Sequence, residues 1–360
     1  MTDLASTADS TDVIPIREHQ RFDETSLAQW MSANVDGHEG PIRVQQFRGG
    51  QSNPTYLVST PTKSYVLRRQ PTGPLLKGAH AVDREAFVQT MLGETQVPVA
   101  RIYGTCRDPD VIGTMFYLME LVEGRIFWDA TFPDVSTADR PAYFQAMNAT
   151  IADLHGVDPD SIGLGDFGRP TGYVERQIKR LSAQYVADLG AGRDPNMDRL
   201  IAWLEQARPR NEGRAAVVHG DYRCDNLIFH PTEPRIVAVL DWELATLGHP
   251  LADFAYHAMM YRMPSHIVAG LAGADLAGLN VPSEQEYLEL YCERTGLSDS
   301  SDYNFFVAFS FFRVAAIIHG IKGRLVRGNA ASPDAAERVK ALPELAELAW
   351  EQARRAGAPA

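Results

Sequence analysis

The stretch VVHGDYRCDNLIFHPTEPRIVAVLDWELATLGHPLADFAYH, from Val217 to His257, decides the fold of this chain. It contains the tripeptide His-Gly-Asp ending at Asp221, then Asn226 after four intervening residues, and a second aspartate, Asp241. Two short apolar runs lie between Asn226 and Asp241, and the segment that separates them is His-Pro-Thr-Glu-Pro. Such a pattern predicts a β-hairpin. We expect the hairpin to carry Asp241 back to the loop of Asp221, so that the two carboxylates converge.

These three side chains form the set that transfer of a γ-phosphoryl group requires. The reaction needs a carboxylate that orients and deprotonates the attacking hydroxyl, together with oxygen ligands that hold Mg²⁺ on the phosphates. In protein kinases the base and a metal-binding asparagine have the spacing D-x-x-x-x-N, and a later aspartate binds the metal. We therefore predict Asp221 as the catalytic base, Asn226 and Asp241 as metal ligands, and ATP with Mg²⁺ as cofactors.

The motif H-G-D-x-x-x-x-N, followed by a hairpin and Asp-Trp-Glu, resembles the aminoglycoside phosphotransferase and choline kinase-like family. The resemblance extends from about Phe47 to about Tyr261, and the runs GGQSNPTY and VLRR also look like the kinase-like domains attached to acyl-CoA dehydrogenases. It implies an α+β, two-lobed protein-kinase-like fold with an antiparallel sheet in a small N-terminal lobe and a larger, mainly helical C-terminal lobe. We expect a disordered tail at residues 1–20, a nucleotide-binding lobe at 21–120, and a catalytic and substrate-binding lobe at 121–360.

A glycine-rich turn, Arg-Gly-Gly-Gln-Ser-Asn, separates two alternating segments that read as strands. Backbone N–H groups of such a turn can surround phosphates, although the turn could equally be a plain hairpin connection. The family resemblance supports Gly50, Ser52 and Asn53 as the tip of a phosphate-binding loop.

Arg68 ends a predicted strand at the position where protein kinases place a lysine that contacts the α and β phosphates. An arginine keeps the charge, but its planar fork does not sit as an ammonium group does. Glu85, in the helical run from His80 to Phe87, is the expected partner that holds Arg68 in place.

The apolar strand from Thr114 to Glu120 leads into Leu-Val-Glu-Gly, the expected connector between the lobes. In kinase-like architectures backbone groups of this connector pair with adenine. The resemblance therefore assigns adenine contacts to the backbones of Glu120 and Val122.

The acceptor is expected to be a small hydroxylated molecule. Only eleven residues separate Asp241 from Asp253, and no Ala-Pro-Glu follows, so the long segment on which protein kinases dock a peptide is missing. The family resemblance suggests aminoglycosides, amino alcohols, sugars or hydroxyacyl compounds as acceptors. We interpret His219 and Asp253 as scaffold for the loop backbone, and Glu243 as a metal ligand, a substrate contact or a surface residue.

Composition is typical of an ordinary soluble enzyme. The chain has 360 residues, is 45% hydrophobic and carries a formal net charge of −12, without a basic run, which argues against nucleic-acid binding. Its three cysteines show no C-x-x-C pattern and fit a reducing cytoplasm. The N-terminus does not have the pattern of a signal peptide. The apolar run from Phe305 to Ile318 is interrupted by Ser310 and Arg313, so we expect a buried helix and no membrane span.

Two alternatives remain open at this stage. A catalytically inactive, nucleotide-binding module would keep the fold without turnover. A metallohydrolase could instead use a ligand set consisting of His219, Asp221, Asp241, His249 and Asp253, but such a site would prefer more nitrogen ligands and an open water position.

Overall fold

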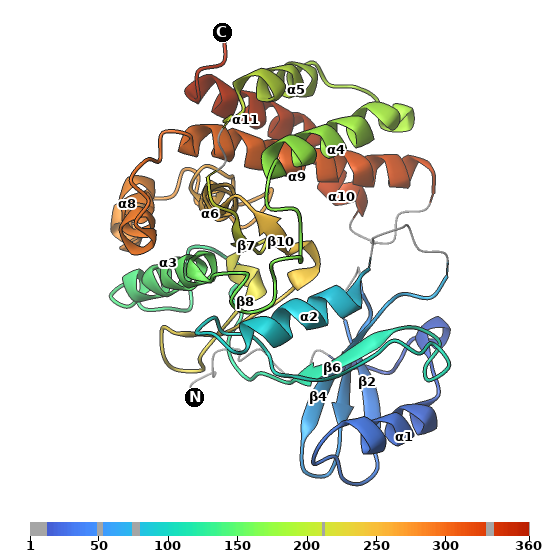
Figure 1. Cartoon of the computed structure of the whole chain (residues 1–360). Coiled ribbons are helices and arrows are strands. Elements are labelled where there is room, and N and C mark those ends of the chain that lie inside the picture. The colour runs from blue at the N-terminus through green and yellow to red at the C-terminus, as the bar shows by residue number, and fades with distance from the viewer. Residues whose placement is uncertain (1–12, 49–52, 74–79, 211–212, 329–334, 360) are drawn as a thin grey trace, which may run out of the picture. The chain divides into compact units, whose positions relative to one another are not determined.

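The computed structural model describes residues 13–48, 53–73, 80–210, 213–328 and 335–359. These residues fall into two compact units, and the chain passes between them three times. The first unit consists of the described parts of Met1–Ile126 together with Asn226–Ala245, and the second of those of Phe127–Asp225 and Thr246–Ala360. Figure 1 traces both units in chain order.

The first unit is built on a six-stranded antiparallel sheet with the order β1-β2-β3-β4-β6-β5. Its first α-helix begins after Asp23, whose carboxylate accepts the backbone N–H groups of Thr25 and Ser26. The elements of this unit are β1 (Val13–Ile14), a 3₁₀ turn (Glu18–Gln20), α1 (Glu24–Asn34), β2 (Arg43–Phe47), β3 (Thr55–Ser59), β4 (Ser64–Arg69), α2 (Val82–Leu92), β5 (Ile102–Cys106), β6 (Phe116–Glu120), β8 (Leu227–Phe229), β9 (Ile236–Val239) and η4 (Trp242–Leu244).

Alternation along the strands gives this sheet two apolar faces. Tyr56 and Val58 belong to a buried cluster with Leu27 of α1, whereas Tyr117 packs with Ala86 of α2. Figure 1 shows α1 and α2 on opposite faces of the sheet. Because successive side chains of a strand point to opposite faces, each helix covers one set of alternate residues.

The predicted hairpin is confirmed, since β8 and β9 pair antiparallel with Leu227 opposite Val239. It packs with the first unit, whereas we expected it in a lobe of residues 121–360. The backbones of Arg125 and Phe229 exchange two hydrogen bonds of 2.8 Å each, and a side chain at Gly124 would overlap the carbonyl oxygen of Phe229. A residue without a Cβ therefore allows the connector to lie directly against the hairpin.

The expectation of a disordered tail at residues 1–20 is wrong for its second part. Residues 13 and 14 form β1, which pairs with β2 through Val13–Phe47 and Ile14–Gln46. The strand is only two residues long and is stabilised by pairing with β2, so the sequence of the segment did not reveal it. Residues 1–12 lie outside the described part of the chain.

The second unit is mainly helical, and its helices α4, α5, α6, α10 and α11 pack against α9. Its elements are α3 (Arg140–Gly156), α4 (Tyr173–Ala187), η2 (Leu189–Ala191), α5 (Pro195–Ala207), β7 (Ala216–Val218), η3 (Cys224–Asn226, whose last residue is assigned to the first unit), β10 (Thr246–Gly248), α6 (Pro250–Ala258), η5 (Met259–Tyr261), α7 (Leu276–Leu279), α8 (Glu284–Thr295), α9 (Tyr303–Val326), α10 (Ala335–Lys340) and α11 (Leu342–Arg355). Figure 1 shows α9 between α11 and α6, and both pack against it.

Helix α9 is long and apolar enough to cross a membrane by length and composition, yet 83% of its most apolar window is buried within the fold. The expectation of a buried helix is therefore confirmed. The α+β class is confirmed as well, with an antiparallel sheet in the N-terminal region and a mostly helical C-terminal part.

Candidate active site

The loop that follows β7 is fixed through its backbone by Asp253 of α6, both in the second unit. The Asp253 carboxylate accepts the N–H of His219 at Oδ2 and the N–H of Gly220 at Oδ1, each at 2.8 Å. Burial alone would raise the pKa of Asp253, but hydrogen bonding and charge from His155, whose Nε2 lies 3.2 Å away, lower it. The predicted role of Asp253 as scaffold is confirmed. It sets the direction in which the chain enters Asp221.

His219 stabilises the same loop from within. Its Nδ1 accepts the backbone N–H of Asp221 at 3.1 Å, and its ring is buried. The predicted scaffold role for His219, a hydrogen bond to the loop backbone, is confirmed. Gly220, between the two residues, has φ +85°, a conformation that glycine adopts at little cost.

The side chain of Asp221 lies among polar partners that the sequence did not reveal. The hydroxyl of Tyr256 donates to Asp221 Oδ1 at 2.8 Å, and Nε of Arg223 lies 3.7 Å from the same oxygen. Burial raises the pKa of Asp221, against the opposing effects of the Arg223 charge and the Tyr256 hydrogen bond. A partner such as Tyr256 could have been inferred from its spacing, because residues three apart on a helix share a face and Asp253 is already turned toward the loop.

The predicted metal ligands Asn226 and Asp241 lie in the first unit, at the same end of the hairpin. The N–H of Leu240 donates to the carbonyl of Asn226 at 2.8 Å, so pairing of the strands places Asp241 close to Asn226 in the ladder. Convergence of Asp221 with Asp241 stays a prediction, since these residues belong to different units.

Asp241 has the left-handed conformation, with φ +64° and ψ +62°. Aspartate tolerates this region better than most side chains, but the conformation must be held by its surroundings. The following residue provides such support, because Trp242 is buried and its indole N–H donates to the carbonyl of Val239 at 2.9 Å. The turn at the end of β9 is thereby fixed by the hairpin itself.

Arg68 is the centre of a charged cluster in the first unit. Its Nε lies 2.9 Å from Glu85 Oε2, which confirms the predicted ion pair, while its Nη2 donates to Asp241 Oδ1 at 2.6 Å and lies 3.7 Å from Glu243 Oε2. Burial raises the pKa of Glu85 to about 7 despite the positive charge of Arg68. The link from Arg68 to Asp241 was not predicted. It uses the planar, forked donor set that distinguishes arginine from lysine.

Asn53 also joins this cluster. Its side chain is buried, its Nδ2 donates to Glu85 Oε1 at 2.8 Å, and its Oδ1 lies 2.9 Å from Nδ1 of His80. A phosphate contact from Asn53 would therefore have to come from its backbone. The other two predicted loop residues, Gly50 and Ser52, lie outside the described residues.

The predicted adenine-binding residues lie where β6 ends, with Glu120 as its last residue. The N–H of Glu120 donates to the carbonyl of Arg101 at 2.9 Å, so an adenine contact from Glu120 would have to use its carbonyl oxygen. Val122 lies two residues further along the connector and is partly buried.

The chemistry of the donor set fits magnesium. A carboxylate and a side-chain amide contribute hard oxygen ligands, which Mg²⁺ prefers, and the Asp241 side chain is 34% exposed. Among the described residues, no group of three or more His, Cys, Asp or Glu side chains is placed to hold a metal ion.

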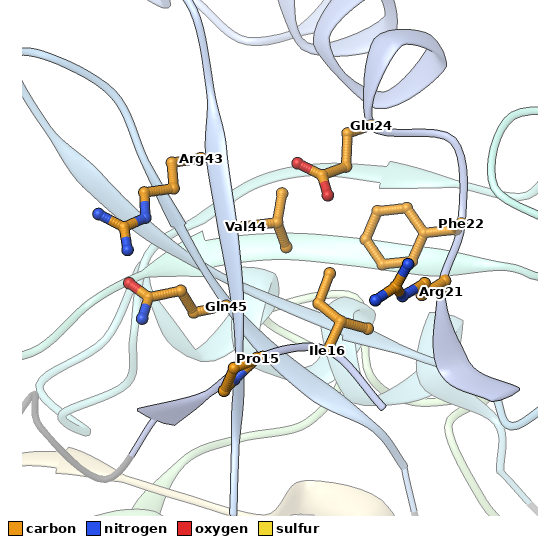
Figure 2. A pocket seen from close by; sticks show the side chains of 8 residues that line it. All are labelled: Pro15, Ile16, Arg21, Phe22, Glu24, Arg43, Val44 and Gln45. Carbon is orange, nitrogen blue, oxygen red and sulfur yellow. The ribbon is translucent and has the colours of Figure 1, made fainter. Parts of the chain in front are cut away.

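A separate pocket of about 530 Å³ lies in the first unit, on the side of β2 near the N-terminal segment. Figure 2 shows Ile16, Phe22 and Val44 turned toward one another, with charged side chains around them. The pocket is lined by Pro15, Ile16, Arg21, Phe22, Glu24, Arg43, Val44 and Gln45. None of these residues belongs to the predicted nucleotide or metal site.

Comparison with known proteins identifies relatives over almost the whole chain. A family model described as "Phosphotransferase enzyme family" matches residues 43–290. Acyl-CoA dehydrogenase family member 10 of Mus musculus is 40% identical over 346 residues, which are 95% of this chain and 32% of that protein. The chain spans less than half the length of the curated relatives it matches.

Solved structures show the same similarity. A candidate aminoglycoside phosphotransferase from Ralstonia eutropha JMP134 is 46% identical, with a TM-score of 0.85 over 93% of this chain and 99% of that one. A thermostable mutant of aminoglycoside phosphotransferase APH(4)-Ia, in ternary complex with ADP and hygromycin B, is 13% identical, with a TM-score of 0.60 over 94% of this chain and 99% of that one. At 13% identity, the similarity to APH(4)-Ia shows only that the two proteins share a fold.

Proposed function

The chain belongs to the phosphotransferase enzyme family, as the resemblance of its motifs implied, and from this premise we propose that it transfers the γ-phosphoryl group of ATP to a hydroxyl of a small molecule. One observation carries the proposal. Asp253 binds the loop backbone at His219 and Gly220 and thereby fixes the position of the next residue, Asp221. The Asp221 carboxylate accepts a hydrogen bond from Tyr256, and Asn226 follows it at the spacing found in phosphoryl-transfer enzymes.

In the proposed reaction Asp221 accepts the proton of the acceptor hydroxyl. The freed oxygen attacks the γ-phosphorus, the bond from that phosphorus to the bridging oxygen breaks, and ADP leaves with the electron pair. Burial raises the pKa of Asp221, which makes its carboxylate a better proton acceptor than a fully solvated one. ADP and AMP-PNP in structures of the same fold support a nucleotide as the phosphoryl donor.

Asn226 and Asp241 would hold Mg²⁺, which neutralises charge on the phosphates when bound. Arg68 would act beside them, because Glu85 holds the Nε of its guanidinium and Asp241 holds Nη2. We assign the adenine contacts to the backbones of Glu120 and Val122.

The phosphate-binding loop remains part of the proposal, with Gly50, Ser52 and Asn53 at its tip. The buried side chain of Asn53 supports an anchoring role, because it links the end of this loop to Glu85.

The proposed acceptor is a small hydroxylated molecule. The short segment between Asp241 and Asp253 offers no peptide platform. Hygromycin B in a protein of the same fold supports aminoglycosides, and relatives named as acyl-CoA dehydrogenase family members support hydroxyacyl compounds. Amino alcohols and sugars complete the set to be tested, and we propose the cytoplasm as the compartment.

The test is Mg²⁺-dependent release of ADP from ATP across a panel of aminoglycosides, amino alcohols, sugars and hydroxyacyl compounds. Wild type is compared with Asp221→Asn and with Asp158→Asn, a control at an exposed aspartate of the same unit. Asp221→Asn should lower turnover by about 100-fold or more while ATP still binds, and Asp158→Asn should leave it unchanged. Full turnover in Asp221→Asn would show that the base is assigned wrongly. ATP binding without turnover of any acceptor would favour the inactive nucleotide-binding module.

A further inference from the structure

Tyr256 contacts the proposed base from the helix that also anchors the loop. It is buried in α6, with 5% of its surface exposed, and its hydroxyl donates to Asp221 Oδ1 at 2.8 Å. Asp253, one turn earlier in α6, binds the backbone of the residues before Asp221. The same short helix thus fixes both the main chain of the loop and the side chain at its functional position.

Arg313 of α9 contacts both the ring of Tyr256 and the backbone of the loop. Its Nη2 donates to the carbonyl of Gly220 at 2.8 Å, and its guanidinium carbon lies 4.6 Å from the centre of the Tyr256 ring. Arg313 is only 5% exposed, in a helix whose other core residues are mainly apolar. A buried charge is costly unless it is paired, and the nearby negative charges are the carboxylates of Asp253 and Asp221.

The hydroxyl of Tyr256 is the informative group, because a phenylalanine would fill the same space. Burial and the nearby charge of Asp221 raise the pKa of Tyr256 well above its ordinary value, so the phenol stays protonated and remains a donor. A phenol buried in this way requires a hydrogen-bond partner, and the partner is the carboxylate of the proposed base.

We propose that Tyr256, held in place by Arg313, is a positioning residue that fixes the orientation of Asp221 and stabilises its carboxylate through Oδ1. The inference rests on the proposed function, in which Asp221 accepts a proton. Tyr256 does not itself react, and acts only through the group that does.

The proposal predicts a change in the titration of Asp221. The groups that face this carboxylate are Tyr256, Arg223, His219, Asp225 and, from α9, Arg313. Three of them, Tyr256, Arg223 and His219, lower the pKa of Asp221, whereas Asp225 and burial raise it. Loss of the Tyr256 donor should therefore raise the pKa of Asp221 further.

The matched pair of variants is Tyr256→Phe and Tyr303→Phe. Tyr303 is also buried and donates to a carboxylate, but that carboxylate belongs to Glu284 (Oε1, 2.8 Å), which lies outside the proposed catalytic set. The pKa of Asp221 is measured by ¹³C NMR on protein labelled at the aspartate carboxyl carbon, with Asp221→Asn for assignment. Rates are measured from pH 5 to pH 9 with MgATP and the acceptor found in the panel, and unfolding temperatures verify that each variant folds.

Tyr256→Phe should raise the pKa of Asp221, lower kcat about tenfold, leave KM for ATP within twofold, and move the acidic limb of the kcat/KM profile to higher pH. Tyr303→Phe should change none of these quantities. An unchanged pKa of Asp221 in Tyr256→Phe, or a rate lowered equally at every pH, would overturn the proposal. If no acceptor turns over even in wild type, the proposed function fails, and the NMR titration still decides whether Tyr256 stabilises the Asp221 carboxylate.

Discussion

Replacement of Gly124 by alanine should loosen the hairpin that carries the proposed metal ligands. A Cβ at this position would overlap the carbonyl oxygen of Phe229 and the side chain of Ile228, so either the connector or β8 has to move. The two hydrogen bonds between Arg125 and Phe229 lie directly beside the overlap. The perturbation therefore acts on the first unit at the point where the connector meets the hairpin.

The magnitude follows from two contributions. Each backbone hydrogen bond contributes about 1 kcal/mol to the free energy of unfolding, so opening the Arg125–Phe229 bridge costs about 2 kcal/mol. Overpacking by one methyl group in a tight contact adds about 1–3 kcal/mol. We expect Gly124→Ala to destabilise the hairpin by about 3–5 kcal/mol in total. MgATP affinity should fall as well, because Asn226 and Asp241 flank the displaced strands.

The assay is hydrogen–deuterium exchange followed by mass spectrometry, which reports local opening of residues 226–245, combined with calorimetric titration of MgATP. Gly156→Ala is the control, since Gly156 is exposed, ends α3, and has no atom within 4 Å of an added Cβ. It should be neutral or slightly stabilising, by up to about 1 kcal/mol. If Gly124→Ala exchanged as slowly as wild type and bound MgATP equally well, the reasoning about the hairpin contact would be refuted.

Three further results are expected. Asp241→Ala should weaken MgATP binding in calorimetry by about tenfold or more, because a carboxylate ligand is lost, whereas ATP without Mg²⁺ should bind both proteins alike. Arg68→Lys should lower the unfolding temperature and MgATP affinity, since one ammonium cannot span both Glu85 and Asp241; values equal to wild type would contradict this. Burial lowers the pKa of His257 from 6.5 to about 4, so between these pH values the unfolded chain binds a proton at this residue and the folded chain does not. The buried neutral His257 therefore contributes about 3 kcal/mol to the free energy of unfolding above pH 6.5, and this contribution is lost as the pH falls toward 4. Scanning calorimetry should show that His257→Gln flattens the pH dependence of stability in that range, with His266→Gln, at an exposed histidine, as control.

The hairpin and the loop were predictable because their signals are local. Turn residues between two apolar runs predict a hairpin whatever surrounds them. The ion pair of Arg68 with Glu85 was predicted from the family resemblance. The scaffold role of Asp253, which accepts hydrogen bonds from the N–H groups of His219 and Gly220, was predicted from the same resemblance. In these cases a few residues at fixed spacing are enough to predict the contact.

Contacts between distant segments could not be predicted in the same way. Arg313 reaches the loop from α9, and nothing in the sequence around Arg313 specifies which part of the chain this helix faces. The bond from Arg68 to Asp241 joins residues 173 positions apart. An arginine within the apolar run of α9 was a usable signal, since such a charge must be paired, but it did not reveal the partner.

Assignment of the hairpin to the first unit also has a consequence for biosynthesis. Along the chain, the last strand of this unit's sheet ends at Glu120. The unit is complete only when the chain has been made as far as Ala245, because β8 and β9 also belong to it. The 119 residues from Phe127 to Ala245 must therefore be synthesised first, which takes about 6–24 s at typical rates of translation. During that interval the nascent sheet lacks the backbone partners that Arg125 and Pro98 find in the hairpin. We expect folding of the first unit on the ribosome to be completed only after the first part of the second unit, Phe127–Asp225, has been synthesised.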